Sequence, residues 1–211
     1  VEFRMRGINQ VQVNNKAGMT FAAALRSILR ADPDVVLIGE IRDQETANIA
    51  IEASLTGHLV LSTLHTNDAP SAVTRLTEMG VEPFLLSSSL AAVMAQRLAR
   101  RLCKKCKRQD TATEAELRTL GVPHMPDTPL PTIWRPVGCR ECANTGYSGR
   151  VAIQQVMGVD STMEDLIARG ATSIDIDKAA KEQGMTTLRK DGWQKALQGI
   201  TSVEEVLRVT V

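Results

Sequence analysis

The stretch that decides the fold is residues 32–43, "DPDVVLIGEIRD". It contains four consecutive apolar residues, Val35 to Ile38, which are followed by Gly39 and then by the carboxylate of Glu40. A short apolar run that is rich in β-branched residues and bounded by turn residues predicts a strand covered on both faces. This strand ends at a glycine and an acidic side chain, which makes Glu40 the first candidate functional residue.

The segments around this strand predict an alternation of helices and strands. Thr20 and Asp43 each stand where a side chain can cap the first turn of a helix. Helices are predicted over 21–31, 44–56 and 69–79, and a second strand is predicted over 58–65. Short connections between such elements are typical of an α/β domain with a parallel sheet. We expect a further buried helix over 83–96 and a return of the chain to this sheet over 97–103.

The composition changes after residue 102. Residues 103–150 hold the cysteines together with several prolines and turn glycines, and this pattern predicts a loop-rich region. Residues 151–211 are predicted to contain a returning strand and then a helical carboxyl-terminal region. We therefore expect three parts, with bounds 1–102, 103–150 and 151–211.

Charge and composition exclude several classes of protein. The chain has 25 basic and 24 acidic residues, so its net charge of +1 indicates no particular partner. Aromatic residues make up only 3% of the chain, which argues against a base-stacking surface, and no nucleic-acid partner is expected. No apolar run approaches the roughly 18 residues of a membrane span, and no basic-then-apolar signal segment opens the chain. Because the chain begins with Val1 and opens on what reads as a strand, we expect that the start of a larger protein is missing.

Glu40 and His65 are predicted to lie at the carboxyl ends of the two strands. Ligands bind outside these ends in open parallel sheets, so the two side chains could share a substrate. His58 lies seven residues before His65, roughly 23 Å away along an extended strand, so the two histidines cannot share a metal. A carboxylate in this position can accept a proton from an attacking water or hold magnesium. The alternative is that Glu40 is simply the first solvated residue after a strand.

Three arginines near this strand have two interpretations each. Arg26 and Arg30 are four residues apart, so they share one face of the predicted helix. Their guanidinium groups could bind a phosphate from a neighbouring subunit. Solvated surface arginines are the commoner explanation, and Arg42 has the same two interpretations. Glu2 lies too close to the chain start to be interpreted by itself.

The cysteines form the strongest pattern that the residues alone provide. They are arranged as two C-x-x-C pairs separated by 32 residues: Cys103, Cys106, Cys139 and Cys142. Zinc favours four ligands in a tetrahedron, and thiolates suit it, so this pattern predicts a structural zinc site in a reducing compartment. With four cysteines no coordination position is left open for catalysis. The alternative is four free thiols or a disulfide.

Basic residues lie beside the first cysteine pair. The cluster consists of Arg100, Arg101, Lys104, Lys105, Lys107 and Arg108. The cluster could contact nucleic acid or anionic lipid, although basic side chains in such a run more often simply lie in solvent at the protein surface. His124 lies in a proline-rich loop and is interpreted as a surface residue.

Several long blocks resemble the bacterial ATPases of the GspE/PilB type, which power type II secretion and type IV pilus assembly. The first block is "LRSILRADPDVVLIGEIRDQETANIAIEASLTGHLVLSTLHTNDAPSAVTRL". The likeness continues through "MAQRLARRLC", the paired C-x-x-C motifs, "GYSGRVAI" and "GMTTLRKDGWQKALQGITSVEEVLRVT". The retraction ATPases of the same superfamily generally lack the four-cysteine insertion, so the resemblance favours the assembly or export branch.

The resemblance implies a fold, an assembly and cofactors. The family has a RecA-like P-loop ATPase core, forms ring-shaped hexamers, and binds ATP with Mg²⁺ at a site that borders the neighbouring subunit. Its cysteine motif binds Zn²⁺ and belongs to a region associated with docking to an inner-membrane platform protein. The implied location is therefore cytoplasmic and peripheral to the inner membrane.

The resemblance also implies roles for individual residues. "VVLIGE" is similar to the atypical Walker B motif of the family, with Glu40 as the catalytic carboxylate. "GHLVLSTLHT" is similar to its His box, which contains His58 and His65, and "VE" resembles the end of its Asp box, which places Glu2 near the nucleotide. Arginines contribute to the intersubunit site in this family, and the candidates here are Arg26, Arg30 and Arg42.

One departure from the family pattern concerns the P-loop. The motif G-x-x-x-x-G-K-[ST] does not occur in the 211 residues, and we expect it upstream of residue 1. We therefore predict that this piece does not hydrolyse ATP by itself. An alternative function is a zinc-stapled docking module for the membrane platform, and a nucleic-acid translocase is a weaker third.

Overall fold

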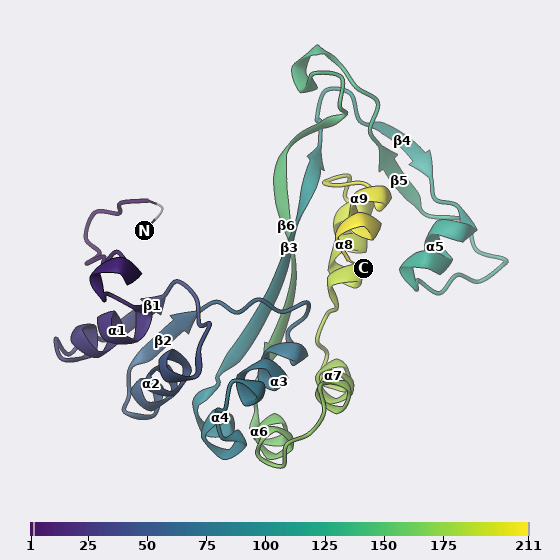
Figure 1. Cartoon of the computed structure of the whole chain (residues 1–211). Coiled ribbons are helices and arrows are strands. Elements are labelled where there is room, and N and C mark those ends of the chain that lie inside the picture. The colour runs from purple at the N-terminus through teal and green to yellow at the C-terminus, as the bar shows by residue number, and fades with distance from the viewer. Residues whose placement is uncertain (2, 211) are drawn as a thin grey trace. The chain divides into compact units, whose positions relative to one another are not determined.

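The structure is a computed structural model that describes residue 1 and residues 3–210 (Figure 1). The chain forms two compact units. The first unit comprises Val1–Val93 and Gly158–Ala179, and the second comprises Met94–Met157 and Ala180–Val211. This grouping differs from the three-part division by composition, which stays a prediction about domains.

The first unit contains the strand of the opening stretch. β1 (Val35–Ile38) pairs in parallel with β2 (Leu59–Ser62), and Ile38 lies opposite Ser62. The predicted caps are present, because Thr20 Oγ1 accepts from Ala23 N at 3.1 Å and Asp43 Oδ1 accepts from Thr46 N at 2.8 Å. The other elements of this unit are η1 (Asn15–Ala17), α1 (Phe21–Leu29), α2 (Gln44–Leu55), α3 (Pro70–Glu78), α4 (Pro83–Ser89), α6 (Ser161–Ala168) and most of α7 (Ser173–Glu182).

The expectation that β1 is covered on both faces is wrong. Val36 and Ile38 are buried, whereas Val35 and Leu37 are 54% and 71% exposed. Their register partners Leu59 and Leu61 are exposed as well. Successive side chains of a strand point to opposite faces, so these four residues form one apolar surface that the described part of the chain leaves open to solvent. We call it the β1–β2 patch.

The expectation of a helix over 83–96 is only partly correct. α4 ends at Ser89, and the chain then forms the strand β3 (Ala92–Leu102). β3 pairs with β6 (Tyr147–Gly158) in a separate two-stranded sheet, so the expected return to the β1–β2 sheet is also wrong. The residues of β3 have good intrinsic helix propensity, but pairing with a distant strand outweighs such local preferences.

The second unit contains the cysteine region and the carboxyl-terminal helices. β4 (Arg108–Thr111) and β5 (Thr132–Arg135) form an antiparallel pair, followed by η2 (Arg140–Cys142). α8 (Leu188–Leu197) packs on β5, and α5 (Glu114–Leu120) and α9 (Val203–Val209) pack on α8 and on each other. Their core consists of Ala99, Ala112, Leu117, Leu120, Ile133, Ile153, Trp193, Ala196, Val203 and Val206. Among the described residues, no helix is both long and apolar enough to cross a bilayer.

Candidate active site and metal centre

Glu40 follows β1 in a turn that is fixed from both sides. Ile41 N donates to the carbonyl oxygen of Thr63 at 3.0 Å, and Thr63 Oγ1 donates to the carbonyl oxygen of Gly39 at 2.6 Å. The residues before and after Glu40 are therefore held by one residue that follows β2. Thr63 was not among the residues predicted from the sequence. No local pattern indicated it, because Thr63 comes one position after the Ile38–Ser62 pair, and this register is known only from the folded structure.

The carboxylate of Glu40 lies between two basic side chains. Its Oε2 is 2.6 Å from Arg42 Nε and 3.2 Å from His65 Nε2. The hydrogen bond from Arg42 lowers the pKa of Glu40; burial opposes this effect and the contact with His65 adds to it. The prediction that Glu40 and His65 lie together is thus consistent with their geometry, and the carboxylate is held in its ionised form.

Three other predicted nucleotide-proximal residues, His58, Arg26 and Arg30, make their contacts elsewhere. His58 precedes β2, where its Nδ1 lies 3.0 Å from the carbonyl oxygen of Ala53 at the end of α2. Arg26 on α1 pairs with Glu45 on α2, and Arg30 is the exposed C-cap of α1. Glu2 lies outside the described residues. The roles of these four residues near a nucleotide stay predictions.

The four cysteines converge on one point in the second unit. Their sulfur atoms all lie within 4.8 Å of one another. The Sγ–Sγ distances are 3.9 Å for Cys103–Cys139, and 3.8 Å for both Cys106–Cys142 and Cys139–Cys142. Four thiolates around zinc, each about 2.3 Å from the metal, stand about 3.8 Å apart at the corners of a tetrahedron. The donor set and its spacing therefore fit a tetrahedral Zn²⁺.

Backbone N–H groups point at these sulfur atoms. Gly138 N donates to Cys106 Sγ at 3.3 Å, and Gly146 N donates to Cys142 Sγ at 3.2 Å. A Cβ at Gly146 would stand 2.4 Å from Pro136 Cβ, so only glycine brings the backbone this close. Hydrogen bonds of this kind favour the thiolate form, which is the form that binds metal.

The first cysteine pair is linked to the turn between α8 and α9. Lys107, next to Cys106, donates from Nζ to the carbonyl oxygen of Gly199 at 2.7 Å. The same Nζ lies 4.4 Å from the ring centroid of Trp134 on β5, within the range of a cation–π interaction. Leu102 N also donates to Ile200 O at 2.9 Å. The cysteine cluster is therefore anchored to the carboxyl-terminal helices, a link that no sequence pattern indicated.

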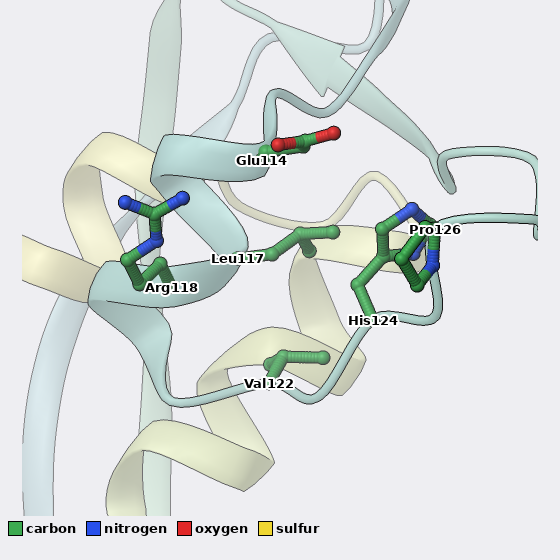
Figure 2. Close-up of a pocket in the computed structure, with 6 residues that line it drawn as sticks. All are labelled: Glu114, Leu117, Arg118, Val122, His124 and Pro126. Atoms are coloured by element: carbon green, nitrogen blue, oxygen red, sulfur yellow. The ribbon is translucent and has the colours of Figure 1, made fainter.

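A small cavity lies beside α5 in the same unit (Figure 2). Its volume is about 240 Å³, and its lining residues are Glu114, Leu117, Arg118, Val122, His124 and Pro126. His124, predicted as a surface residue, is partly buried here, and its Nδ1 lies 3.3 Å from Thr128 Oγ1. The cavity is smaller than the roughly 300–1,000 Å³ of ordinary ligand pockets, and we assign it no ligand.

Known proteins resemble the chain along its whole length. It matches the family described as "Type II/IV secretion system protein" over residues 1–208. It is 51% identical to the type IV pilus assembly ATPase PilB of Thermus thermophilus, across 100% of this chain and 24% of the relative. It is 54% identical to the type II secretion system protein E of Pseudomonas aeruginosa, across 100% of this chain and 41% of the relative. The chain thus spans less than half the length of these relatives.

Two solved structures share the fold at lower identity. The pilus retraction motor PilT with bound ADP has a TM-score of 0.61 and 24% identity, covering 90% of this chain and 43% of that one. The ATPase DotB of Yersinia pseudotuberculosis has a TM-score of 0.63 and 18% identity, covering 92% of this chain and 41% of that one. The prediction of an α/β, RecA-like fold with a four-cysteine region and a helical carboxyl-terminal region is confirmed.

Proposed function

Because this chain belongs to the type II/IV secretion system protein family, we propose that it forms part of a hexameric ATPase that powers type II protein secretion or type IV pilus assembly. The observation that carries the proposal is the placement of Glu40 just after the carboxyl end of β1, the edge at which parallel sheets bind ligands. Thr63 fixes the turn that carries Glu40, and two basic side chains keep the carboxylate ionised.

Glu40 is the catalytic residue of this proposal. Its carboxylate accepts a proton from water as the water oxygen bonds to the γ-phosphorus of ATP. The bond from that phosphorus to the ADP oxygen breaks, ADP and phosphate leave, and Glu40 returns the proton to solvent. Mg²⁺, when bound with ATP, supplies positive charge at the phosphate oxygens. The residues proposed to lie near the nucleotide, from the same or a neighbouring subunit, are Glu2, Arg26, Arg30, Arg42, His58 and His65.

The loop that binds the phosphates is proposed to come from another part of the longer protein. The 211 residues contain no G-x-x-x-x-G-K-[ST] motif, whose backbone N–H groups and lysine hold the phosphates in P-loop enzymes. The isolated 211-residue chain is therefore expected to lack ATPase activity. Turnover by the isolated chain that disappears in Glu40→Gln would contradict this expectation.

The experiment that tests the proposed activity compares Glu40→Gln with wild type in the longer protein. The isosteric amide cannot accept the proton, so turnover of ATP should fall at least about 100-fold while ATP binding is retained. The control is Glu52→Gln, because Glu52 is an exposed carboxylate of α2 outside the site. Equal turnover in Glu40→Gln and in the control would refute the role of Glu40.

The four cysteines are proposed to hold one structural Zn²⁺. Cys103, Cys106, Cys139 and Cys142 supply a complete tetrahedral donor set, so this metal would order the chain around it and take no part in hydrolysis.

A second candidate function is a zinc-stapled docking module for an inner-membrane platform protein, on the cytoplasmic side of that membrane. The supporting observation is an uneven distribution of charge. Basic residues outnumber acidic ones in the second unit, which carries the cysteines, whereas acidic residues outnumber basic ones in the first. Nucleic acid is not the expected partner. Capture of a platform protein by the longer wild-type protein, lost in Cys139→Ser, would support docking; equal capture by both proteins would contradict it.

A further inference from the structure

Both basic contacts of Glu40 reach the same carboxylate oxygen. Arg42 Nε and His65 Nε2 lie 2.6 Å and 3.2 Å from Oε2. No hydrogen bond or ion pair of the described residues reaches Oε1, and the Glu40 side chain is 21% exposed. The two oxygens of this carboxylate therefore differ, because Oε2 has two basic partners and Oε1 has none among the described residues.

The turn itself allows Glu40 little freedom beyond its side-chain torsions. Thr63 holds Gly39 and Ile41 through two hydrogen bonds, and the Ile41 side chain is buried at 8% exposure. Arg42 follows two residues after Glu40, with the buried Ile41 between them, and its side chain reaches the carboxylate of Glu40. The orientation of the carboxylate is then set by the groups that bind Oε2.

Arg42 is the stronger of these two groups. An arginine guanidinium is a permanent positive charge in proteins and holds its N–H donors in a fixed planar geometry. The contact of Arg42 is the shorter one, and Arg42 lies on the same turn as the carboxylate.

We propose that Arg42 is a positioning residue for Glu40: together with His65 it anchors Oε2 and thereby directs Oε1 toward the water that attacks ATP. This inference rests on the proposed ATPase function and specifies it further, because it assigns the proton of that water to Oε1. Arg42 acts through Glu40 and makes no direct contact with the phosphates.

The first experiment needs no enzymatic activity. The pKa of Glu40 is measured by NMR of its side-chain carbon in the 211-residue chain, in wild type, Arg42→Gln and His65→Gln. Among the described residues, the charged groups that contact Glu40 are Arg42, two residues later, and His65 from the segment after β2. The pKa should rise in both variants and rise more in Arg42→Gln. The control is Arg75→Gln on α3, whose partner is Glu78, and it should leave the pKa of Glu40 unchanged. An unchanged pKa in Arg42→Gln would overturn the proposal, whatever the activity of the longer protein.

The second experiment uses steady-state ATP hydrolysis by the longer protein. Arg42→Gln should lower kcat about 10- to 100-fold with little change in KM for ATP, because a misdirected carboxylate affects the chemical step and not nucleotide binding. The acidic limb of the kcat/KM profile should move to higher pH, and Arg42→Lys should recover part of the loss. A raised KM with unchanged kcat would instead indicate a direct phosphate ligand and would overturn the positioning role. If wild type has no ATPase activity, the proposed function fails, and the NMR result still decides the contact between Arg42 and Glu40.

Discussion

The indole ring of Trp134 lies so close to the backbone of Gly199 that a Cβ on the glycine would stand 2.5 Å from the ring. Gly199 also has a φ of +64°, in the left-handed region. Its carbonyl oxygen accepts the hydrogen bond from Lys107, the residue after Cys106. Three segments that are distant in the sequence therefore meet at one glycine: the first cysteine pair, β5 and the turn before α9.

Gly199→Ala should destabilise the second unit by about 2–4 kcal/mol. About 1–2 kcal/mol arises from the left-handed backbone, and the rest arises from overlap of the new methyl group with the Trp134 ring. Urea unfolding followed by tryptophan fluorescence measures this loss, because both tryptophans, Trp134 and Trp193, belong to this unit.

The matched control for this substitution is Gly121→Ala. Gly121 has a φ of +72°, but a Cβ there would meet nothing within 4 Å, so only the backbone cost applies. Equal losses for the two variants would show that the contact between Trp134 and Gly199 contributes nothing to stability.

Metal removal should be visible at Trp134. Cys106 and Lys107 are adjacent, so release of the metal should withdraw the Lys107 ammonium from the indole ring and expose the ring to water. In a Trp193→Phe background, a chelator should shift the fluorescence emission to longer wavelength and release one zinc per chain. Cys103→Ser and Cys139→Ser should lose the metal, with local unfolding of residues 103–142. Substoichiometric zinc in a natively folded preparation, or unchanged emission after chelation, would contradict the proposed site.

Local patterns predicted the elements that depend on local interactions. Caps at Thr20 and Asp43 and the apolar run at 35–38 correctly predicted α1, α2 and β1. β3 was partly predicted as helix because its conformation depends on β6, which begins 45 residues after β3 ends. Nothing in the local pattern of β1 indicates which of its faces remains open.

In the two sites as well, features set by local sequence could be predicted, and features that depend on the folded structure could not. The spacing of the cysteines predicted their convergence, because each C-x-x-C pair forms a short local turn. The order of the two strands predicted that Glu40 and His65 lie near each other. The roles of Thr63 and Lys107 could not be predicted, because each bonds to a backbone oxygen whose position depends on the folded structure.

A buried carboxylate should make the second unit sensitive to acid. Glu205 on α9 is 1% exposed. Burial by itself would raise its pKa, but hydrogen bonds from Arg208 and Arg100 outweigh burial and lower the pKa to about 2. Because the folded pKa lies below the ordinary value of 4.5, the ionised group stabilises the fold fully above about pH 4.5. This contribution, about 3 kcal/mol, is lost as the pH falls from 4.5 toward 2.

Glu205→Gln should remove most of this pH dependence. It should also destabilise the unit near pH 7, because Arg100 and Arg208 lose their shared counter-charge. The measurement is the free energy of unfolding between pH 2 and 7 for wild type and Glu205→Gln. Other carboxylates of the unit, such as Glu116 and Asp110, also have lowered pKa values, so the difference between the two proteins is the informative quantity. Glu182→Gln, an exposed carboxylate of the same unit, serves as the control. The role of Glu205 would be contradicted if the free energies of unfolding of wild type and Glu205→Gln differed by the same amount at every pH in this range.

The β1–β2 patch should promote association of the isolated 211-residue chain. Val35, Leu37, Leu59 and Leu61 are between 47% and 71% exposed and adjacent in register, and contiguous apolar surface of this kind favours self-association. Leu37→Lys places a charge at the most exposed of these positions and should shift the chain toward monomer in sedimentation velocity. Its stability should change by no more than about 0.5 kcal/mol, since the side chain is mostly in solvent. Phe84→Lys replaces an exposed apolar residue outside the patch and should leave association unchanged. If the two variants associate equally, the patch does not drive association.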